Sequence, residues 1–234
     1  MIRAIIFDFD GLILDTELPE FQTWQEIYQA HGCTLSFAVW ATCIGTIGAF
    51  DPYVYLEEQL GRAVDRVAVQ AQQRQRCDAL IAAQTVLPGV HDYLAEARRL
   101  GLHVGVASSS SRTWVHGHLT RLELSQHFLC IKCRDDVLHP KPDPALYQAA
   151  LEALGVQPQE AIALEDSPNG ILAAKRAGLF CVAVPNVLTR QLPLHQADLQ
   201  IPSLAALPLS ELLRTIHSGG IIQSTIHSGG IIQK

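Results

Sequence analysis

The hydrophobic positions of this chain gather in short runs that are rich in β-branched residues and do not alternate with polar ones. Such runs are typical of strands that are buried on both faces of a parallel sheet. The sequence therefore predicts buried strands at residues 2–7, 102–107, 128–131, 161–164 and 180–184.

Helical stretches separate most of these runs, and their ends carry the expected residues. Pro168 opens one stretch and Gly178 follows its end, in agreement with the preference for proline in the first turn and glycine just beyond the last. Helices are predicted at residues 90–100, 112–124, 144–154 and 168–177. Strands that alternate with helices indicate a doubly wound α/β fold with a mostly parallel sheet.

Residues 16–84 break this alternation, because they contain no convincing buried strand. Helical patterns occur there at residues 20–31, 37–43, 52–61 and 66–83. We expect residues 16–84 to form an all-helical second lobe, inserted into a core made of residues 1–15 and 85–214. A single extended helical layer is the alternative.

The last residues of the chain contain a duplication. The sequence TIHSGGIIQ at residues 215–223 recurs unchanged at residues 225–233. Two copies of so short a unit do not make a solenoid, which needs longer units and at least three copies. We expect residues 215–234 to be a tail without function.

Composition narrows the class of protein. The chain has 234 residues, of which 48% are hydrophobic and 17% are charged, as in globular proteins. The net charge of −6 leaves no basic field for nucleic acid or an anionic membrane. No apolar run is long enough to span a bilayer, and Asp8 and Asp10 interrupt the only apolar stretch near the start. We expect a cytoplasmic protein.

Polar side chains follow the predicted strands at their carboxyl ends, where parallel sheets bind ligands. The residues concerned are Asp8 and Asp10 after the first strand, Ser108–Ser111 after the second, Lys141 beyond the third, and Glu165 and Asp166 after the fourth. Each group has a simpler interpretation, such as a turn at Asp10 or a helix cap at the serines. Their coincidence at several strand ends favours a shared site.

The chemistry of this set is consistent with phosphoryl transfer. Crowded carboxylates raise one another's pKa unless a cation is present, and an all-oxygen ligand set suits Mg²⁺. Asp8 and Asp10 point to the same side of an extended segment, so that one can attack while the other transfers a proton. Ser108 and Lys141 supply donors for phosphate oxygens.

Four segments resemble the ordered motifs of the haloacid dehalogenase superfamily. They are DFDGLILDTE at residues 8–17, VASSSS around Ser108, KPDP at Lys141 and LEDSPNGI at residues 164–171. The resemblance covers residues 1 to about 214 and is strongest to the β-phosphoglucomutase-like phosphatases, which insert a helical cap after the first motif. It implies a Rossmann-like core with this cap, an Mg²⁺ cofactor and a monomer.

The resemblance also implies roles for individual residues. Asp8 would be the nucleophile and Asp10 the general acid and base. Ser108 and the Ser109 amide would hold the phosphoryl group, and Lys141 would bridge Asp8 and the phosphate. The implied magnesium ligands are Asp8, Asp10 through its carbonyl, Glu165 and Asp166.

The cap supplies candidates for contact with the rest of the substrate. Trp24, Gly45 and Thr46 are candidates for the leaving group, although Trp24 is equally suited to the core of the lobe. Arg74 and Arg76 could hold a distal phosphate, or could simply belong to a solvated helix face.

Comparison within the superfamily favours hydrolysis. The metal-independent dehalogenases lack an acid/base residue at the position of Asp10, and no lysine precedes Lys132 to form the Schiff base of the phosphonate-cleaving relatives. The mutases carry a histidine where this chain has Glu20, and a cap lysine that is missing here. We therefore predict a Mg²⁺-dependent phosphatase of a small phosphorylated metabolite, such as a sugar phosphate, that forms an aspartyl-phosphate. The alternatives are a sugar-phosphate mutase and a non-catalytic binding protein.

Overall fold

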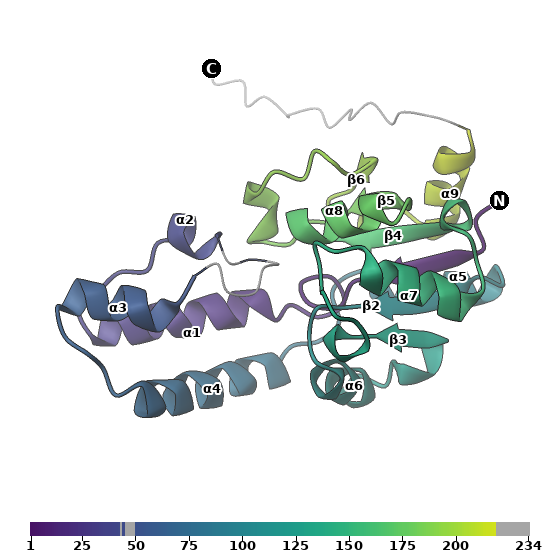
Figure 1. The fold of residues 1–234 in the computed structure, drawn as a ribbon. Coiled ribbons are helices and arrows are strands. Elements are labelled where there is room, and N and C mark those ends of the chain that lie inside the picture. The colour runs from purple at the N-terminus through teal and green to yellow at the C-terminus, as the bar shows by residue number, and fades with distance from the viewer. Residues whose placement is uncertain (43, 45–49, 219–234) are drawn as a thin grey trace, which may run out of the picture.

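The structure, a computed structural model, describes residues 1–42, 44 and 50–218. Six parallel strands form one sheet in the order β3-β2-β1-β4-β5-β6, and Figure 1 shows helices on both of its faces and a helical lobe to one side. The strands are β1 Ala4–Phe7, β2 His103–Ala107, β3 Cys130–Lys132, β4 Ala161–Glu165, β5 Phe180–Ala183 and β6 Leu199–Gln200. The prediction of a doubly wound α/β fold is confirmed.

The absence of polar alternation in the strands is explained by burial on both faces. Alternate residues of β1 enter two separate cores: Ile5 and Phe7 pack into one, and Ala4 and Ile6 into the other. The first core includes residues of α5 and α6, and the second includes residues of α7 and α8. These helices are α5 Val90–Arg99, α6 Arg112–Arg121, α7 Ala145–Leu154 and α8 Pro168–Arg176.

The order of the strands reverses at β1, which pairs with β2 on one side and β4 on the other. Phe7 lies opposite both Val106 and Leu164, so the three strands end at nearly the same level. In open α/β sheets, ligands bind outside the carboxyl ends of the strands at this switch point. The topology therefore places Asp8 and Glu165 at that position.

One strand and one α-helix were not predicted from the sequence. The strand β6 has two residues, too few for a periodic pattern, and joins the sheet through Val182 and Leu199. The helix α9 spans Leu209–His217 and buries Leu209 and Leu212 against the first core. The first copy of the repeat thus begins within α9, whereas residues 219–234 lie outside the described residues.

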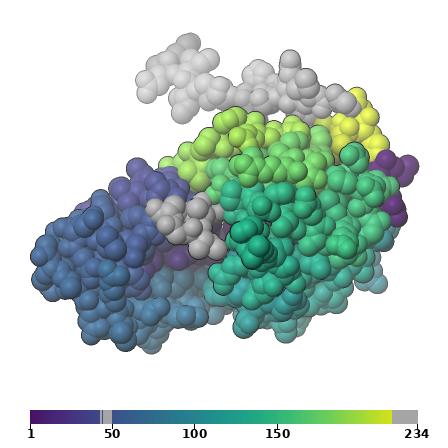
Figure 2. Space-filling view, viewed as in Figure 1, coloured from purple at the N-terminus to yellow at the C-terminus, as the bar shows by residue number. Residues whose placement is uncertain are grey.

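The described residues between β1 and α5 form four helices with a separate apolar core. They are α1 Glu17–Ala30, α2 Phe37–Trp40, α3 Pro52–Leu60 and α4 Arg66–Ala82. Asp51 and Asp65 begin α3 and α4, since the carboxylate of each accepts hydrogen bonds from two backbone N–H groups of the first turn. Figure 2 shows this helical lobe in blue beside the core. The exact boundaries of the cap, 16–84, remain a prediction.

The helices of the described residues offer no candidate for a membrane span. Among residues 1–42, 44 and 50–218, no helix combines the length and the hydropathy that crossing a bilayer requires.

Gly89 is a position where only glycine fits. It precedes α5 with a φ of +88°, and a Cβ atom there would lie 2.2 Å from the backbone nitrogen of Ala205. We expect Gly89→Ala to lower the free energy of unfolding by about 2–4 kcal/mol, because both backbone strain and overlap with the backbone oppose it. Urea denaturation measures this loss.

Gly117 provides the matched control. It lies within α6, and an added Cβ would meet no atom within 4 Å. Gly117→Ala should therefore stabilise the protein by about 0.5–1 kcal/mol through helix propensity. Equal stability of Gly89→Ala and the wild type would contradict this account of the turn.

Candidate active site

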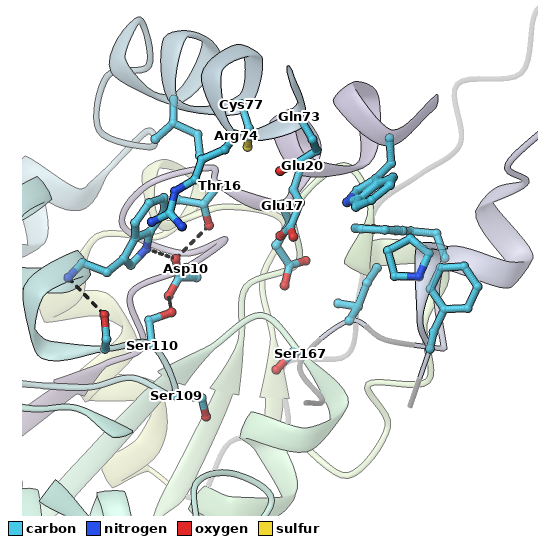
Figure 3. Close-up of a pocket in the computed structure, with 18 of the residues that line it drawn as sticks. Asp10, Thr16, Glu17, Glu20, Gln73, Arg74, Cys77, Ser109, Ser110 and Ser167 are labelled. Atoms are coloured by element: carbon cyan, nitrogen blue, oxygen red, sulfur yellow. Dashed lines mark hydrogen bonds between the residues drawn. The ribbon is translucent and has the colours of Figure 1, made fainter. Parts of the chain in front are cut away.

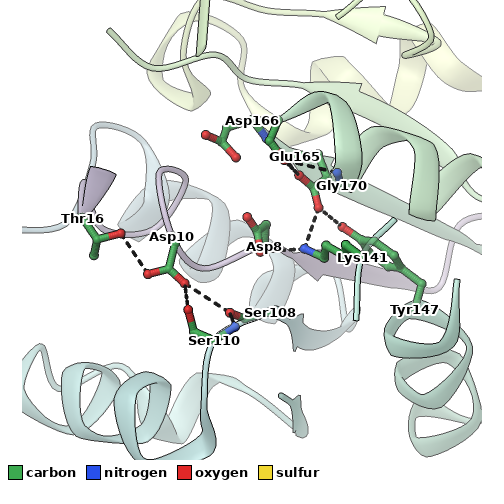
Figure 4. Close-up of polar contacts among 11 residues, drawn as sticks. Asp8, Asp10, Thr16, Ser108, Ser110, Lys141, Tyr147, Glu165, Asp166 and Gly170 are labelled. Atoms are coloured by element: carbon green, nitrogen blue, oxygen red, sulfur yellow. Dashed lines mark hydrogen bonds and ion pairs between the residues drawn. The ribbon is translucent and has the colours of Figure 1, made fainter. Parts of the chain in front are cut away.

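Three carboxylates meet at the carboxyl ends of β1 and β4. Asp8 follows β1, Glu165 is the last residue of β4, and Asp166 comes next. All three are buried. Each can offer one oxygen atom such that these atoms lie within 4.8 Å of one another (Figure 4).

A buried lysine joins two of these carboxylates. The Nζ atom of Lys141 donates hydrogen bonds to Oδ1 of Asp8 at 2.7 Å and to Oε1 of Glu165 at 2.6 Å. The hydroxyl of Tyr147, on α7, donates to the same Oε1 at 2.6 Å. The ammonium group therefore fixes the nucleophile candidate against the neighbouring strand.

Burial governs the electrostatics of this cluster. It raises the pKa of Asp8 to about 7; the charges of Glu165 and Asp10 add to this rise, and Lys141 opposes it. Burial acts to lower the pKa of Lys141, but the charges and hydrogen bonds of Asp8 and Glu165 together raise it above its ordinary value. Lys141 is therefore a cation, and one positive charge faces several carboxyl groups.

The chemistry of the cluster fits a magnesium ion. Its donors are all carboxylate oxygens, as Mg²⁺ prefers. Oδ2 of Asp166 accepts a hydrogen bond from Asn186 at 2.8 Å, whereas Oδ1 is buried and has no hydrogen-bond partner in the described part of the chain. Burial, with the charges of Glu17 and Asp8, raises the pKa of Asp166 well above its ordinary value. A cation would reduce the repulsion among these carboxylates and would give Oδ1 of Asp166 a partner.

Asp10 lies beside this cluster, and its carboxylate points toward α6. Its Oδ1 atom accepts hydrogen bonds from Thr16 Oγ1 and Trp114 Nε1, both at 2.9 Å. Its Oδ2 atom accepts from Ser110 Oγ at 2.6 Å and from Ser108 Oγ at 3.2 Å. Ser108 is fully buried and bonded to Asp10, so the serine cluster does more than cap α6.

A cavity of about 670 Å³ opens between this site and the cap helices (Figure 3). Asp8, Asp10, Ser109, Lys141 and Asp166 line it on the core side. The hydroxyl oxygen of Ser109 is buried and has no partner among the residues that the structure describes. The cap side is lined by, among others, Glu17, Glu20, Trp24, Trp40, Tyr53, Gln73 and Arg74.

The two glutamates give the cap side of the cavity its acidic character. Glu17 is half-buried; desolvation raises its pKa well above the ordinary value, and the charges of Asp10 and Asp8 add to the rise. Its Oε2 atom is buried without a hydrogen-bond partner in residues 1–42, 44 and 50–218. Glu20 is exposed to solvent within the cavity.

The structure separates the cap residues that the sequence suggested. Arg74 and Trp24 line the cavity. Arg76 does not: it lies at a different surface hollow, where its guanidinium pairs with Glu26 at 3.1 and 3.2 Å. Gly45 and Thr46 lie outside the described residues.

Several residues of the site were not singled out from the sequence. Asn186 follows β5, so the strand-end argument that found Asp8 could have found it as well. Tyr147 and Trp114 lie inside helices, and no local pattern distinguishes them from core aromatic residues. Their roles depend on which helix packs against which strand.

Comparisons with known proteins identify the family of this chain. The profile of the haloacid dehalogenase-like hydrolases matches residues 5–184. The chain belongs to this family. It is 45% identical to YhcW of Bacillus subtilis (strain 168), over 93% of this chain and 99% of YhcW. It is 30% identical to the validoxylamine A 7'-phosphate phosphatase of Streptomyces hygroscopicus subsp. limoneus, over 87% and 95% of the two chains.

A solved structure extends the likeness to three dimensions. CbbY from Rhodobacter sphaeroides, determined in complex with phosphate, superposes with a TM-score of 0.72 at 31% identity. The match covers 91% of this chain and 99% of CbbY. The family is thus found by sequence comparison, and the fold is shared with a solved structure.

The raised pKa of Asp8 predicts a pH-dependent response to magnesium. At about pH 5.5 the Asp8 carboxyl retains its proton and competes with the ion, whereas at about pH 8 it is ionised. We expect Mg²⁺ to raise the Tm at the higher pH and to have little effect at the lower one. Thermal unfolding at both pH values measures this difference.

Without magnesium, the raised pKa of Asp8 also makes the free energy of unfolding decrease as the pH rises. The folded state keeps a proton on Asp8 up to about pH 7 that the unfolded state loses near its ordinary pKa. The free energy of unfolding should therefore fall as the pH rises between these values. Asp8→Asn, which cannot ionise, should lack this component of the fall.

In the first experiment, an equal effect of Mg²⁺ on the Tm of the wild type at both pH values would contradict the assignment of Asp8 as a magnesium ligand.

Proposed function

We propose that this protein is a Mg²⁺-dependent phosphatase that hydrolyses a small phosphorylated metabolite through an aspartyl-phosphate on Asp8. The observation that supports this most directly is the contact of a buried ammonium group, Lys141, with the carboxylate of Asp8 at the floor of a cavity. A nucleophilic carboxylate must be ionised and held in one direction, and this contact favours both.

The residues around Asp8 divide the reaction between them. Asp8 attacks the phosphorus in line, while Lys141 and the Ser109 amide bind phosphate oxygens. Asp10 protonates the leaving alcohol and then takes a proton from the water that attacks the aspartyl-phosphate. A magnesium ion held by Asp8, Glu165, Asp166 and the Asp10 carbonyl supplies charge neutralisation at the phosphate when it is bound.

The cap side of the cavity favours an uncharged leaving group with hydroxyl groups. Glu17 and Glu20 accept hydrogen bonds from hydroxyls, and Glu20 in its ionised form repels a second anion. Trp24, Trp40 and Tyr53 offer apolar surface for a carbon skeleton. The name of the Streptomyces relative, validoxylamine A 7'-phosphate phosphatase, supports a substrate of this class. We therefore propose monophosphates of sugars or similar polyols.

A sugar-phosphate mutase is the second candidate, because Arg74 reaches the same cavity from α4 and could hold a second phosphate. The glutamates on the cap side of the cavity make a mutase less favourable. Glu20 occupies the position at which the resembling mutases have a histidine, and its charge disfavours the bisphosphate that a mutase must retain.

The first test is the hydrolysis of a generic aryl phosphate with and without Mg²⁺. We expect turnover that requires the ion, and a loss of about a thousandfold or more in kcat for Asp8→Asn, because the nucleophile is removed. Asp92→Asn, an exposed aspartate on α5, is the matched control and should retain full activity. Turnover by Asp8→Asn at the wild-type rate would exclude the proposed nucleophile.

A second assay separates the two candidate functions. Incubation with β-glucose 1-phosphate should release inorganic phosphate and glucose if water is the acceptor. Glucose 6-phosphate formed in preference to phosphate would establish the mutase instead.

A further inference from the structure

One face of α6 connects the site with the far end of the cap. Trp114, His118 and Arg121 are spaced by four and three residues, so they lie on the same side of the helix. Each of them contacts its neighbour in this row. The row begins at the carboxylate of Asp10 and ends at the last turn of α4.

Trp114 forms the end of the row nearest the reaction. Its indole Nε1 donates to Oδ1 of Asp10 at 2.9 Å. Its ring packs edge-on against the ring of His118, with centroids 4.4 Å apart, and its backbone N–H is held by the Ser111 hydroxyl that caps α6. The indole donor is therefore fixed in direction by the helix and by a neighbouring ring.

His118 links this ring to the next two groups. It stacks on Phe9, the residue between Asp8 and Asp10, with ring centroids 6.3 Å apart. Burial, together with the charge of Arg121, lowers the pKa of His118, so the imidazole is neutral and Nδ1 can accept. The Nε atom of Arg121 donates to this Nδ1 at 3.4 Å.

Arg121 attaches the row to the cap. Its guanidinium donates to the carbonyl oxygens of Ile81, Ala82 and Gln84 at 3.2–3.3 Å. These carbonyls end α4 and begin the return to the core, and α6 lies beside that end of α4 (Figure 1). The last carbonyls of a helix have no partner within it, and a cation there is favourable.

We infer that the α6 row of Trp114, His118 and Arg121 is a positioning element that sets the direction of the Asp10 carboxylate and ties it to the end of α4. The inference rests on the proposed function, in which Asp10 is the acid and base. It extends that function because it gives Trp114, which also lines the cavity, and Arg121 a role that acts through Asp10.

The hydrogen bonds of Asp10 explain why its direction needs such control. Each of its oxygens accepts two hydrogen bonds, which together fill the positions that an ionised carboxylate offers. Oδ1 is shared between Thr16, just before α1, and Trp114 in the core. Of the four donors to this carboxylate, only the indole of Trp114 belongs to a helix, so Trp114 provides its most rigid support.

The test is a double-mutant cycle with Asp10→Asn, measured in single turnovers with enzyme in excess so that very slow rates remain measurable. Trp114→Phe keeps the aromatic ring and removes the donor. We expect it to lower the rate constant at saturation about tenfold, with KM for the same aryl phosphate changed by less than about twofold. In the Asp10→Asn background, the same substitution should change the rate by less than about twofold.

Arg121→Met tests the other end of the row, because it keeps the aliphatic stem and removes the donors to α4. It should lower the rate constant about threefold or more, and this loss should also disappear in the Asp10→Asn background. Thr113→Ala, on the exposed side of α6, is the matched control and should leave the rate unchanged. Urea denaturation verifies that each variant is folded.

The outcomes separate the inference from the function on which it rests. The inference is overturned if Trp114→Phe and Arg121→Met lower the rate constant by the same factor in the wild type and in the Asp10→Asn variant, or if they change KM alone. Either result would show that Trp114 and Arg121 only support packing. A fully active Asp10→Asn variant would overturn the role of Asp10 in the proposed function as well.

Discussion

The contact of Lys141 with Asp8 and Glu165 is the interaction on which the site depends. Several carboxyl groups converge where β1 and β4 end, and without a positive charge their burial would favour the protonated forms. The lysine compensates part of this charge and holds Asp8 in one direction. A metal ion at Asp8, Glu165 and Asp166 would compensate the remaining negative charge. The crowding of buried carboxylates, which is unfavourable without a cation, therefore favours the binding of one.

The parallel sheet itself brings these carboxyl groups together. Because all six strands are parallel, their carboxyl ends lie along one edge, and the reversal of strand order at β1 opens the crevice there. The cap closes the crevice with the acidic first turn of α1 and with α4. Residues from distant parts of the chain thus share one cavity, with Asp8 and Lys141 on its core side and Glu20 and Arg74 on its cap side.

The sequence was sufficient to predict the site residues at the strand ends, but not the helix residues that contact them. Buried strands lack polar alternation and are short, so Asp8, Glu165 and Asp166 could be found as the polar residues at the strand ends. Asn186, just beyond β5, is within reach of the same argument. Trp114, Tyr147 and Arg121 could not be found, because their roles arise from the packing of helices on strands, which no local pattern encodes. The sequence offered Arg74 and Arg76 equally as candidates for binding a distal phosphate. In the structure Arg74 lines the cavity, whereas Arg76 pairs with Glu26.

The central claim is that Asp8 becomes covalently bonded to phosphorus, and acid-quenched rapid mixing tests it most directly. The enzyme, with Mg²⁺, is mixed with a substrate whose phosphoryl group is labelled, quenched within milliseconds, and mapped by peptide. The account predicts a transient, alkali-labile label on the peptide that contains Asp8, and none in Asp8→Asn. Label on a serine or histidine peptide, or phosphate release during full turnover without any protein-bound label, would contradict it.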